Sequence, residues 1–415
     1  MPTVPRRRGG ALSAAFALLC ALCAAPALGA APDPAQPAPP PPQIRLSAEG
    51  ECTFPAPPLK GKPWALQRVM LDQLWSKATG RGVLVAVIDS GVDAGNPQLA
   101  PALSDKGRDD FATGTGGKVD ENSHGTMAAG IIAARHRDDT GFTGLARDAM
   151  ILPIRQNGGT DAQKGNVETL ISAIRYAADQ GAKVINISQE TSGPNGTAPD
   201  PRLEAAIRYA VDVKDAVVVA AAGNRGDKDN LDTYPAMYEG VLAVGASDRN
   251  NDRAAFSQNK PYVGVLAPGV DIWSTVPKGG HCSGSGTSYA APYASAVAAL
   301  VRSLHPTWKA RQVITVIEQT AQRGQAGSKD GSGWGVVDPL KAVTFDGEPG
   351  LKPVETGMLP PQAAPVHVEP LSFGPTRAER DRQTGTVVAA VGLAGVLLLV
   401  SGAVVLRDAR RRGRA

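Results

Sequence analysis

Three short motifs, far apart in this chain, contain the residue types of nucleophilic catalysis. Asp89 ends an apolar run before Ser-Gly-Val-Asp, His124 begins a His-Gly-Thr motif, and Ser288 lies within Gly-Thr-Ser-Tyr-Ala-Ala-Pro. A serine hydroxyl is a weak nucleophile at neutral pH, so it needs a base within hydrogen-bond reach, and that base needs an orienting group. We predict that His124 accepts the proton of Ser288 and that Asp89 orients the imidazole.

Each of these residues also has an ordinary structural interpretation. An aspartate after an apolar strand is often a turn residue. A single histidine is usually structural or exposed, and a serine between small residues usually belongs to a flexible loop. We favour catalysis because the three motifs occur together in one chain. The remaining four of the five histidines stand in no comparable motif; they are His136, His281, His305 and His367.

Asn224 is a further candidate, because it ends the run Ala-Ala-Ala-Gly-Asn after an apolar strand. The tetrahedral intermediate of acyl transfer needs hydrogen-bond donors for its oxyanion. The predicted donors are the side-chain amide of Asn224 and the backbone N–H of Ser288, which lies at the start of an apolar helical stretch. The alternative is that Asn224 is only a turn or capping residue.

Strand-like runs alternate with helix-like runs between residues 63 and 344. The strand-like runs are nearly continuous Val, Ile and Ala, whereas the apolar positions of the longest helix-like run follow helical spacing. Continuous apolar strands are typical of a parallel sheet covered on both faces. The sequence therefore predicts an α/β fold with a doubly wound, mostly parallel sheet and helices on both faces. The predicted strands are 83–88, 150–154, 184–188 and 216–221; the predicted helices follow His124 and cover 167–180 and 201–213.

The composition is that of a globular protein without a nucleic-acid-binding surface. Hydrophobic residues make up 42% of the 415 positions, which is enough to bury a core. The formal net charge is only +4 and lies partly in C-terminal arginines, whereas a nucleic-acid footprint needs a clustered basic face. We expect no cofactor and no metal. Asp227, Asp229 and Asp232 could line a structural calcium site, but a solvated loop is the favoured interpretation.

Residues 1–30 have the pattern of a secretory signal peptide. Three arginines at positions 6–8 precede an apolar run from Ala11 to Ala25, and small residues follow it. The alternative is a membrane anchor, but the apolar run is short for a span. Residues 31–62 then form a proline-rich linker and an N-terminal extension, which lead into the globular domain at 63–344.

A second apolar segment, residues 386–406, contains no charged residue and is long enough to cross a bilayer. A proline- and glycine-rich linker at 345–385 precedes it, and an arginine-rich tail at 407–415 follows it. The positive-inside rule places that tail in the cytoplasm and the globular domain outside. A buried core helix is the alternative, but the segment lies beyond a linker and is apolar all round.

Cleavage of the signal would leave Cys52 and Cys282 as the only cysteines of the mature chain. In an oxidising compartment, two cysteines indicate one disulfide. That bond would join the N-terminal extension to a loop six residues before Ser288. Two unrelated free thiols are the alternative.

The motifs around Asp89, His124 and Ser288, in this chain order, resemble those of the subtilisin-like serine proteases. The similarity extends over roughly residues 64–340 and includes the segment of Asn224. The resemblance implies the subtilisin-like fold, peptide-bond hydrolysis, and an Asn224 side chain that points into the oxyanion hole.

The resemblance also implies that the strand ending near Ser188 lines the substrate cleft, where its backbone pairs with an extended peptide. Many subtilisins carry a Ser-Leu-Gly-like triplet at this place. Here the cleft residues are Ser188, Gln189 and Glu190. Because the last two differ in kind from that triplet, the side-chain preference of the family's pocket does not carry over to this chain.

The N-terminal extension is too short for the propeptide domain that subtilisins usually carry. A proline-rich start, a cysteine in the extension, and a C-terminal anchor with an arginine tail are together similar to the mycosins. Mycosins are the membrane-anchored subtilases of type VII secretion systems. The resemblance implies an extracytoplasmic serine endopeptidase that associates with the membrane components of such a system and processes exported proteins. Two other functions stay open: a structural clamp of the secretion membrane complex, and a free-standing cell-surface subtilase.

Overall fold

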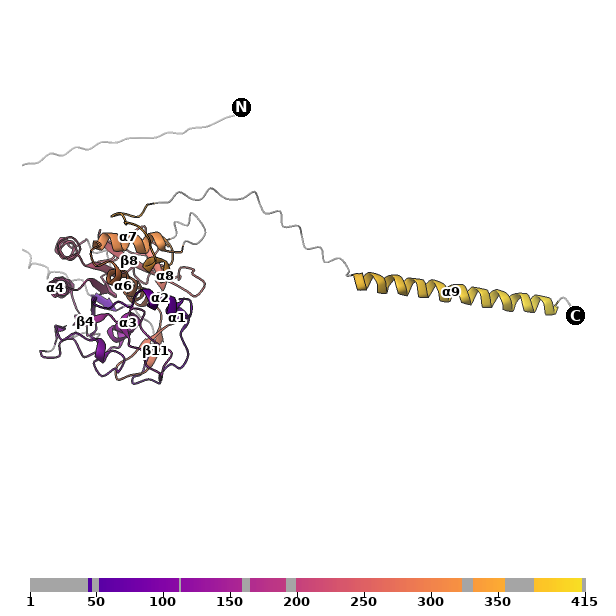
Figure 1. Cartoon of the computed structure of the whole chain (residues 1–415), viewed down its shortest axis with the longest axis horizontal. Helices are drawn as coiled ribbons and strands as arrows, with labels where there is room; N and C mark the ends of the chain where they lie inside the picture. Colours follow the sequence, from indigo (N-terminus) through magenta and orange to yellow (C-terminus); the bar gives the residue numbers. More distant parts are fainter. Residues whose placement is uncertain are drawn as a thin grey trace, which may run out of the picture. The chain divides into compact units, whose positions relative to one another are not determined.

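The computed structural model describes residues 44–46, 52–111, 113–158, 165–191, 199–322, 331–354 and 377–412. It divides the chain into a unit that ends at Val354 and a unit that begins at Glu355. Figure 1 draws the first as an α/β body and shows the yellow helix α9 of the second. The predicted signal peptide at 1–30 lies outside the described residues, as does most of the proline-rich segment after it.

The first unit is built on a seven-stranded sheet with the strand order β3-β4-β2-β5-β7-β8-β9, in which every neighbouring pair is parallel. Consecutive strand residues point to opposite faces, and almost all of them are buried in the central strands, so both faces are covered. The predicted doubly wound α/β fold is confirmed. The strands are β2 (Leu84–Asp89), β3 (Arg108–Asp109), β4 (Met150–Arg155), β5 (Val184–Ile187), β7 (Val217–Ala221), β8 (Val241–Ser247) and β9 (Val263–Pro268).

The order of the strands reverses at β2. The chain leaves β2 for β4 on one side and then returns to β5 on the other side. In parallel sheets, sites form at such a switch point, beyond the carboxyl ends of the strands. Asp89 is the last residue of β2, Ser188 directly follows β5, and Asn224 lies in the loop after β7. The sheet therefore puts three of the predicted site residues at one end.

Helix α6 (Thr287–Leu304) lies in the core of this unit. Every residue from Thr287 to Arg302 is buried, and the helix packs on β5, β7 and β8 and against α3 (His124–Ala133). A helix that is apolar on all sides needs such a position. The two helices that carry the candidate serine and histidine are thus direct neighbours.

The other helices are close to the prediction. The predicted helix 167–180 is α4 (Val167–Asp179), and the side chain of Asn166 caps it by accepting from Thr169 N–H. The predicted helix 201–213 is α-helical only in α5 (Pro201–Arg208) and continues as the π-helix η3 (Tyr209–Val213). The remaining ones are α1 (Trp64–Gln67), α2 (Leu71–Lys77), the short 3-10 helix η1 (Ala100–Ala102), α7 (Ala310–Thr320) and α8 (Pro339–Val343).

Two small antiparallel sheets flank the main one. β10 (Ile272–Thr275) pairs with β11 (His281–Gly284), which leads into α6. β1 (Ile44–Leu46), from the N-terminal extension, pairs with β6 (Gln189–Thr191), which follows β5. The extension therefore reaches the strand that the sequence marks as the substrate cleft.

The described part of the second unit is the single helix α9 (Arg377–Arg412). It contains the predicted span 386–406, and by length and composition it can cross a membrane. It extends beyond the apolar segment at both ends, into the charged residues that flank it.

Candidate active site

Asp89 and His124 form a buried pair at the carboxyl end of β2. The distance from Asp89 Oδ1 to His124 Nδ1 is 2.8 Å, and Oδ1 also accepts from the backbone N–H of Ser90 at 2.7 Å. Both side chains are almost completely excluded from solvent. Because an ionised carboxylate only accepts hydrogen bonds, the Nδ1 atom carries the proton and the Nε2 atom keeps its lone pair. This tautomer is the one that a general base requires.

Opposing effects act on the protonation of His124. Burial lowers the pKa of His124, but the charge and hydrogen bond of Asp89 raise it, and the charge of Asp120 adds to this. The carboxylates prevail, so the pKa lies above the ordinary value of a histidine. The site therefore stabilises the imidazolium that forms when the histidine takes up a proton.

Asp120 is a site residue that the sequence analysis missed. Its Oδ2 accepts from the N–H and the hydroxyl of Thr126 at 2.8 and 2.6 Å, and its Oδ1 accepts from Ser123 N–H at 3.0 Å. Ser90 donates its hydroxyl to Asp120 at 2.9 Å and accepts from Gly125 N–H at 2.9 Å. Asp120 thus holds both the first turn of α3 and the residue beside Asp89. An aspartate just before a predicted helix is a capping signal that could have marked it.

Ser288 is the second residue of α6, and the loop that carries Asn224 is bound to the start of this helix. Asn224 Oδ1 accepts from the backbone N–H of Thr287 at 2.8 Å, and Gly223 N–H donates to Thr287 Oγ1 at 3.1 Å. This contact holds the amide oxygen of Asn224 at the residue before Ser288. Thr287, which the sequence analysis did not single out, brings these two residues together.

Tyr289 connects the serine helix to the histidine helix. Its ring centroid lies 5.4 Å from that of His124, with the planes tilted by 45°. Its hydroxyl donates to the Sδ atom of Met127 on α3 at 3.7 Å. The residue next to Ser288 therefore contacts His124 directly, which puts the serine and the histidine in the same part of the site.

The side chains of the predicted cleft residues Ser188 and Gln189 form hydrogen bonds with groups in the protein interior. Ser188 Oγ accepts from Asn186 Nδ2 at 2.8 Å. Gln189 donates from Nε2 to the carbonyl of Ile88 at 2.9 Å, and its Oε1 accepts from Asn157 Nδ2 at 3.3 Å. These contacts tie β6 to the ends of β2 and β5, where Asp89 lies.

The backbone edge of β6 already pairs with an extended segment. Ile44 lies opposite Thr191, Arg45 opposite Glu190, and Leu46 opposite Gln189, in antiparallel register. The segment belongs to the N-terminal extension. The strand that the resemblance assigns to peptide binding therefore pairs with the protein's own chain.

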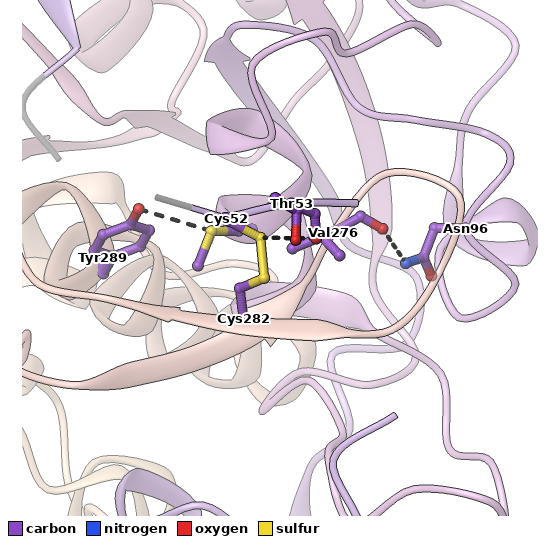
Figure 2. The surroundings of a disulfide bond; sticks show 7 residues. Cys52, Thr53, Asn96, Val276, Cys282 and Tyr289 are labelled. Atoms are coloured by element: carbon purple, nitrogen blue, oxygen red, sulfur yellow. Dashed lines mark hydrogen bonds between the residues drawn. A yellow bond between two sulfur atoms is a disulfide. The ribbon is translucent and has the colours of Figure 1, made fainter. Parts of the chain in front are cut away.

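Cys52 and Cys282 form a disulfide, as predicted, so the alternative of two free thiols is wrong. Cys282 lies on β11, opposite Ser274 of β10, and β11 leads into α6. Figure 2 shows the bond with Tyr289 drawn nearby. The extension is thus covalently fastened to the hairpin that precedes Ser288.

Hydrogen bonds continue this attachment beyond the disulfide. Ala56 N–H donates to the carbonyl of Gly279 at 3.1 Å, and Leu59 N–H donates to His281 Nδ1 at 3.0 Å. His281 in turn donates from Nε2 to Gln98 Oε1 at 2.8 Å. Burial lowers the pKa of His281 to about 4, so the ring stays neutral near pH 7 and keeps both contacts.

Two of the three acids considered for calcium form ion pairs with basic side chains. Asp229 binds Arg225, and Asp232 binds Lys260 at 3.0 Å. Within the described ranges, no group of three His, Cys, Asp or Glu side chains could hold a metal ion.

Comparison with known proteins agrees with this geometry. The family model described as the subtilase family matches residues 80–335. The chain is 38% identical to Mycosin-4 of Mycobacterium tuberculosis over 389 residues, an alignment that covers 85% of this chain and 83% of that protein. The chain therefore belongs to the subtilase family, and it is a serine endopeptidase.

Within the subtilases the chain is similar to the mycosins in structure as well. The crystal structure of MycP1 without its N-terminal propeptide is 35% identical, with a TM-score of 0.63, and the match covers 70% of this chain and 99% of that one. A chain in the periplasmic assembly of the ESX-5 inner membrane complex is 31% identical, with a TM-score of 0.65, and the match covers 76% and 91% of the two chains. The protein is a mycosin-like subtilase.

Proposed function

We propose that this protein is a membrane-anchored, extracytoplasmic endopeptidase with the triad Asp89, His124 and Ser288, and that it processes exported proteins together with a type VII secretion complex. The observation that carries the proposal is the buried hydrogen bond of 2.8 Å between Asp89 and His124. The helix that begins at His124, α3, packs against α6, the helix that carries Ser288.

In the proposed mechanism, Ser288 Oγ attacks the carbonyl carbon of the scissile peptide bond. His124 Nε2 accepts the hydroxyl proton and then gives it to the leaving amine, while Asp89 keeps the Nδ1 proton and stabilises the imidazolium. Asn224 NH₂ and the backbone N–H of Ser288 donate to the oxyanion. Water then cleaves the acyl-enzyme through the same groups in reverse order.

A fluorophosphonate probe, which forms a covalent bond with an activated serine, tests the triad. We expect labelling of the processed protein at Ser288, and loss of labelling in Ser288→Ala and in His124→Ala. The matched control is His136→Ala, because His136 is an exposed histidine that pairs with the exposed Asp138. A folded protein that is not labelled, or equal labelling of all variants, would contradict the triad.

The proposed location rests on α9 and its flanking charge. The helix can span a bilayer, and arginines lie at its C-terminal end. This arrangement favours a cytoplasmic C-terminus and an external catalytic unit. We expect an added protease to remove the catalytic unit from intact cells stripped of their wall. Protection of that unit, with a cytoplasmic marker also intact, would overturn the orientation.

A structural role is the second candidate, because one similar chain belongs to the periplasmic assembly of a secretion inner membrane complex. If scaffolding dominates, Ser288→Ala leaves assembly and secretion intact, whereas deletion of residues 377–415 abolishes both. If proteolysis dominates, Ser288→Ala alone stops the processing of exported proteins. Failure of any secretion component to co-purify would instead favour a free-standing surface protease.

A further inference from the structure

The orientation of the His124 imidazole depends on packing as well as on hydrogen bonds. Its Nδ1 atom binds Asp89 Oδ1 at 2.8 Å. Its Nε2 atom is buried and has no hydrogen-bond partner within the part of the chain that the structure describes. Because the bond to Asp89 alone allows the ring to turn, the direction of the Nε2 lone pair depends on what packs against the ring. That direction decides whether the histidine can accept the proton of Ser288.

Tyr289 supplies such packing from the residue next to the nucleophile. Its ring is buried, and its centroid lies 5.4 Å from that of His124. Burial raises the pKa of the Tyr289 hydroxyl, and the charges of Asp89 and Asp120 raise it further. The tyrosine is therefore neutral at the pH at which the histidine exchanges its proton, and its ring can remain in place throughout the reaction.

The Tyr289 ring is itself held at its outer end. A Cβ atom added to Gly284 would lie 2.6 Å from the Cε2, Cζ and hydroxyl oxygen atoms of this ring, so the ring occupies the space that a side chain at position 284 would need. Gly284 is the last residue of β11. The Tyr289 hydroxyl donates to Met127 Sδ on α3 at 3.7 Å, the dashed line that starts at Tyr289 in Figure 2. The ring is thus confined by β11 and by the helix that carries His124.

The hairpin of β10 and β11 also binds this helix directly. Ser274 Oγ donates to the carbonyl of Met127 at 2.7 Å, and Thr275 Oγ1 donates to the carbonyl of Thr126 at 2.9 Å. Both carbonyls belong to the first turn of α3, which begins at His124. One hairpin therefore holds the helix of the histidine and the ring that packs on the histidine.

We propose that Tyr289 is a positioning residue of this protease: its ring, held by Gly284 of the β10–β11 hairpin, keeps the imidazole of His124 turned toward Ser288. This inference rests on the proposed function, because it assigns Tyr289 a role in the reaction of the triad. It also gives the hairpin a part in catalysis. The N-terminal extension is bonded to that hairpin through Cys282.

The effect should appear in the chemical step and not in substrate binding. Without the ring, the imidazole can turn away from the serine, and a displacement of about 1 Å in a reacting group can lower a rate by about a hundredfold. Tyr289 is only 4% exposed, so a bound peptide has little access to it. Loss of the ring should therefore lower kcat and leave KM nearly unchanged.

The first test compares Tyr289→Leu with Tyr289→Phe in the full-length protein in detergent. The measurements are the rate constant for fluorophosphonate labelling of Ser288, and kcat and KM for a fluorogenic peptide that the wild type cleaves. In Tyr289→Leu we expect the labelling rate and kcat to fall by about ten- to a hundredfold, with KM changed by less than about twofold. Tyr289→Phe keeps the ring and loses only the hydrogen bond to the weak acceptor Met127, so it should restore most of both rates.

The second test displaces the ring from its other end. The methyl group added in Gly284→Ala requires the ring of Tyr289 to shift, so the labelling rate and kcat should fall again. In Tyr289→Leu the atoms at the ring end are absent, and Gly284→Ala should cause little further loss there. The matched control is Gly61→Ala, which should have wild-type rates because an added Cβ meets no atom within 4 Å.

Thermal unfolding shows which variants are folded, and the substitutions at positions 284 and 289 each test the inference independently. Wild-type rates in folded Tyr289→Leu, a rise in KM with unchanged kcat, or additive losses in the double variant would overturn the inference. Equal loss in Tyr289→Phe and Tyr289→Leu would overturn the role of the ring. Wild-type labelling separates the two failures. A folded wild type that is not labelled refutes the triad, whereas labelling that Tyr289→Leu does not slow refutes only the role of Tyr289.

Discussion

Two buried carboxylates act on His124 in different ways. Asp89 hydrogen-bonds to the imidazole and sets its tautomer. Asp120 acts through its charge and through the loop that it binds at Ser123 and Thr126. Asp120 is therefore a positioning residue, and its effect on the protonation of His124 can be separated from that of Asp89.

The substitution Asp120→Asn should move the acid limb of the pH profile of kcat/KM to lower pH. The neutral imidazole is the active base, and removal of the Asp120 charge lowers the pKa of His124, so the base stays neutral at a lower pH. The measurement is kcat/KM against pH, with the exposed Asp138→Asn as the control. An acid limb that stays in place, or moves to higher pH, would refute this role.

Loss of the Asn224 amide should reduce kcat far more than it changes KM. Asn224 is predicted to donate to a charge that is present only in the transition state and intermediate, so Asn224→Ala should lower kcat by about a hundred- to a thousandfold. Steady-state kinetics on one peptide measure both constants. Asn250→Ala, at an exposed asparagine, is the control. A rise in KM with unchanged kcat would show that Asn224 binds the ground state instead.

At the scale of elements, the pairing of β1 with β6 is the feature with the clearest consequence. The edge of β6 offers backbone groups to an extended partner, and β1 uses them at Gln189, Glu190 and Thr191. A peptide that binds along the same edge must replace these backbone contacts. We therefore predict that the extension competes with a substrate peptide for the edge of β6.

Deletion of residues 31–50, with Cys52 retained, should lower KM for long peptides by about two- to tenfold and leave kcat unchanged. Arg45→Pro should act in the same direction, because proline fits poorly in the middle of a paired strand. Peptide kinetics measure the effect. Labelling by the small fluorophosphonate should not change, since the probe does not need the edge of β6. A higher KM after the deletion would mean that the extension helps to form the cleft.

At the scale of the whole molecule, a disulfide joins two distant parts of the chain within the catalytic unit. Cys52 and Cys282 are separated by 230 positions. Around the bond, Ala56 and Leu59 bind the hairpin of β10 and β11. The part of the N-terminal extension from Cys52 onward is therefore fastened to the folded unit.

The double variant Cys52→Ser with Cys282→Ser should lower the free energy of unfolding by about 2–5 kcal/mol, since a crosslink that closes a long loop restricts the unfolded chain. Chemical denaturation of the catalytic unit under oxidising conditions measures the difference. Under reducing conditions, the free energy of unfolding of the wild-type protein should approach that of the double variant. Equal stability of oxidised wild type and double variant would show that the noncovalent contacts alone hold the extension.

Local patterns were sufficient for much of this architecture. The nearly continuous apolar runs of β2, β4, β5 and β7 predicted a covered parallel sheet, because strands buried on both faces show little polar alternation. The helical spacing in 167–180 predicted α4. The disulfide followed from the count of cysteines in an oxidising compartment.

The contacts that complete the site were not predictable in the same way. Asp120 meets Ser90, and Thr287 meets Asn224, across 30 and 63 positions. Hydrophobic periodicity reports on which face a residue occupies and carries no information on which distant polar group it meets. The pairing of Ile44–Leu46 with β6 could not be predicted either, because a strand of three residues is too short to show a hydrophobic pattern.

The sequence by itself determined the kind of sheet, the apolar span, and the chemical candidates Asp89, His124 and Ser288, because each depends on local residue types and spacing. Only the tertiary structure decided how these groups meet. It joined Asp89 to His124 at a strand switch point, turned Asn224 toward the serine helix through Thr287, and packed Tyr289 between His124 and Gly284. These are nonlocal arrangements, and their geometry arises only when the packed core brings the carboxyl ends of parallel strands and the start of α6 together.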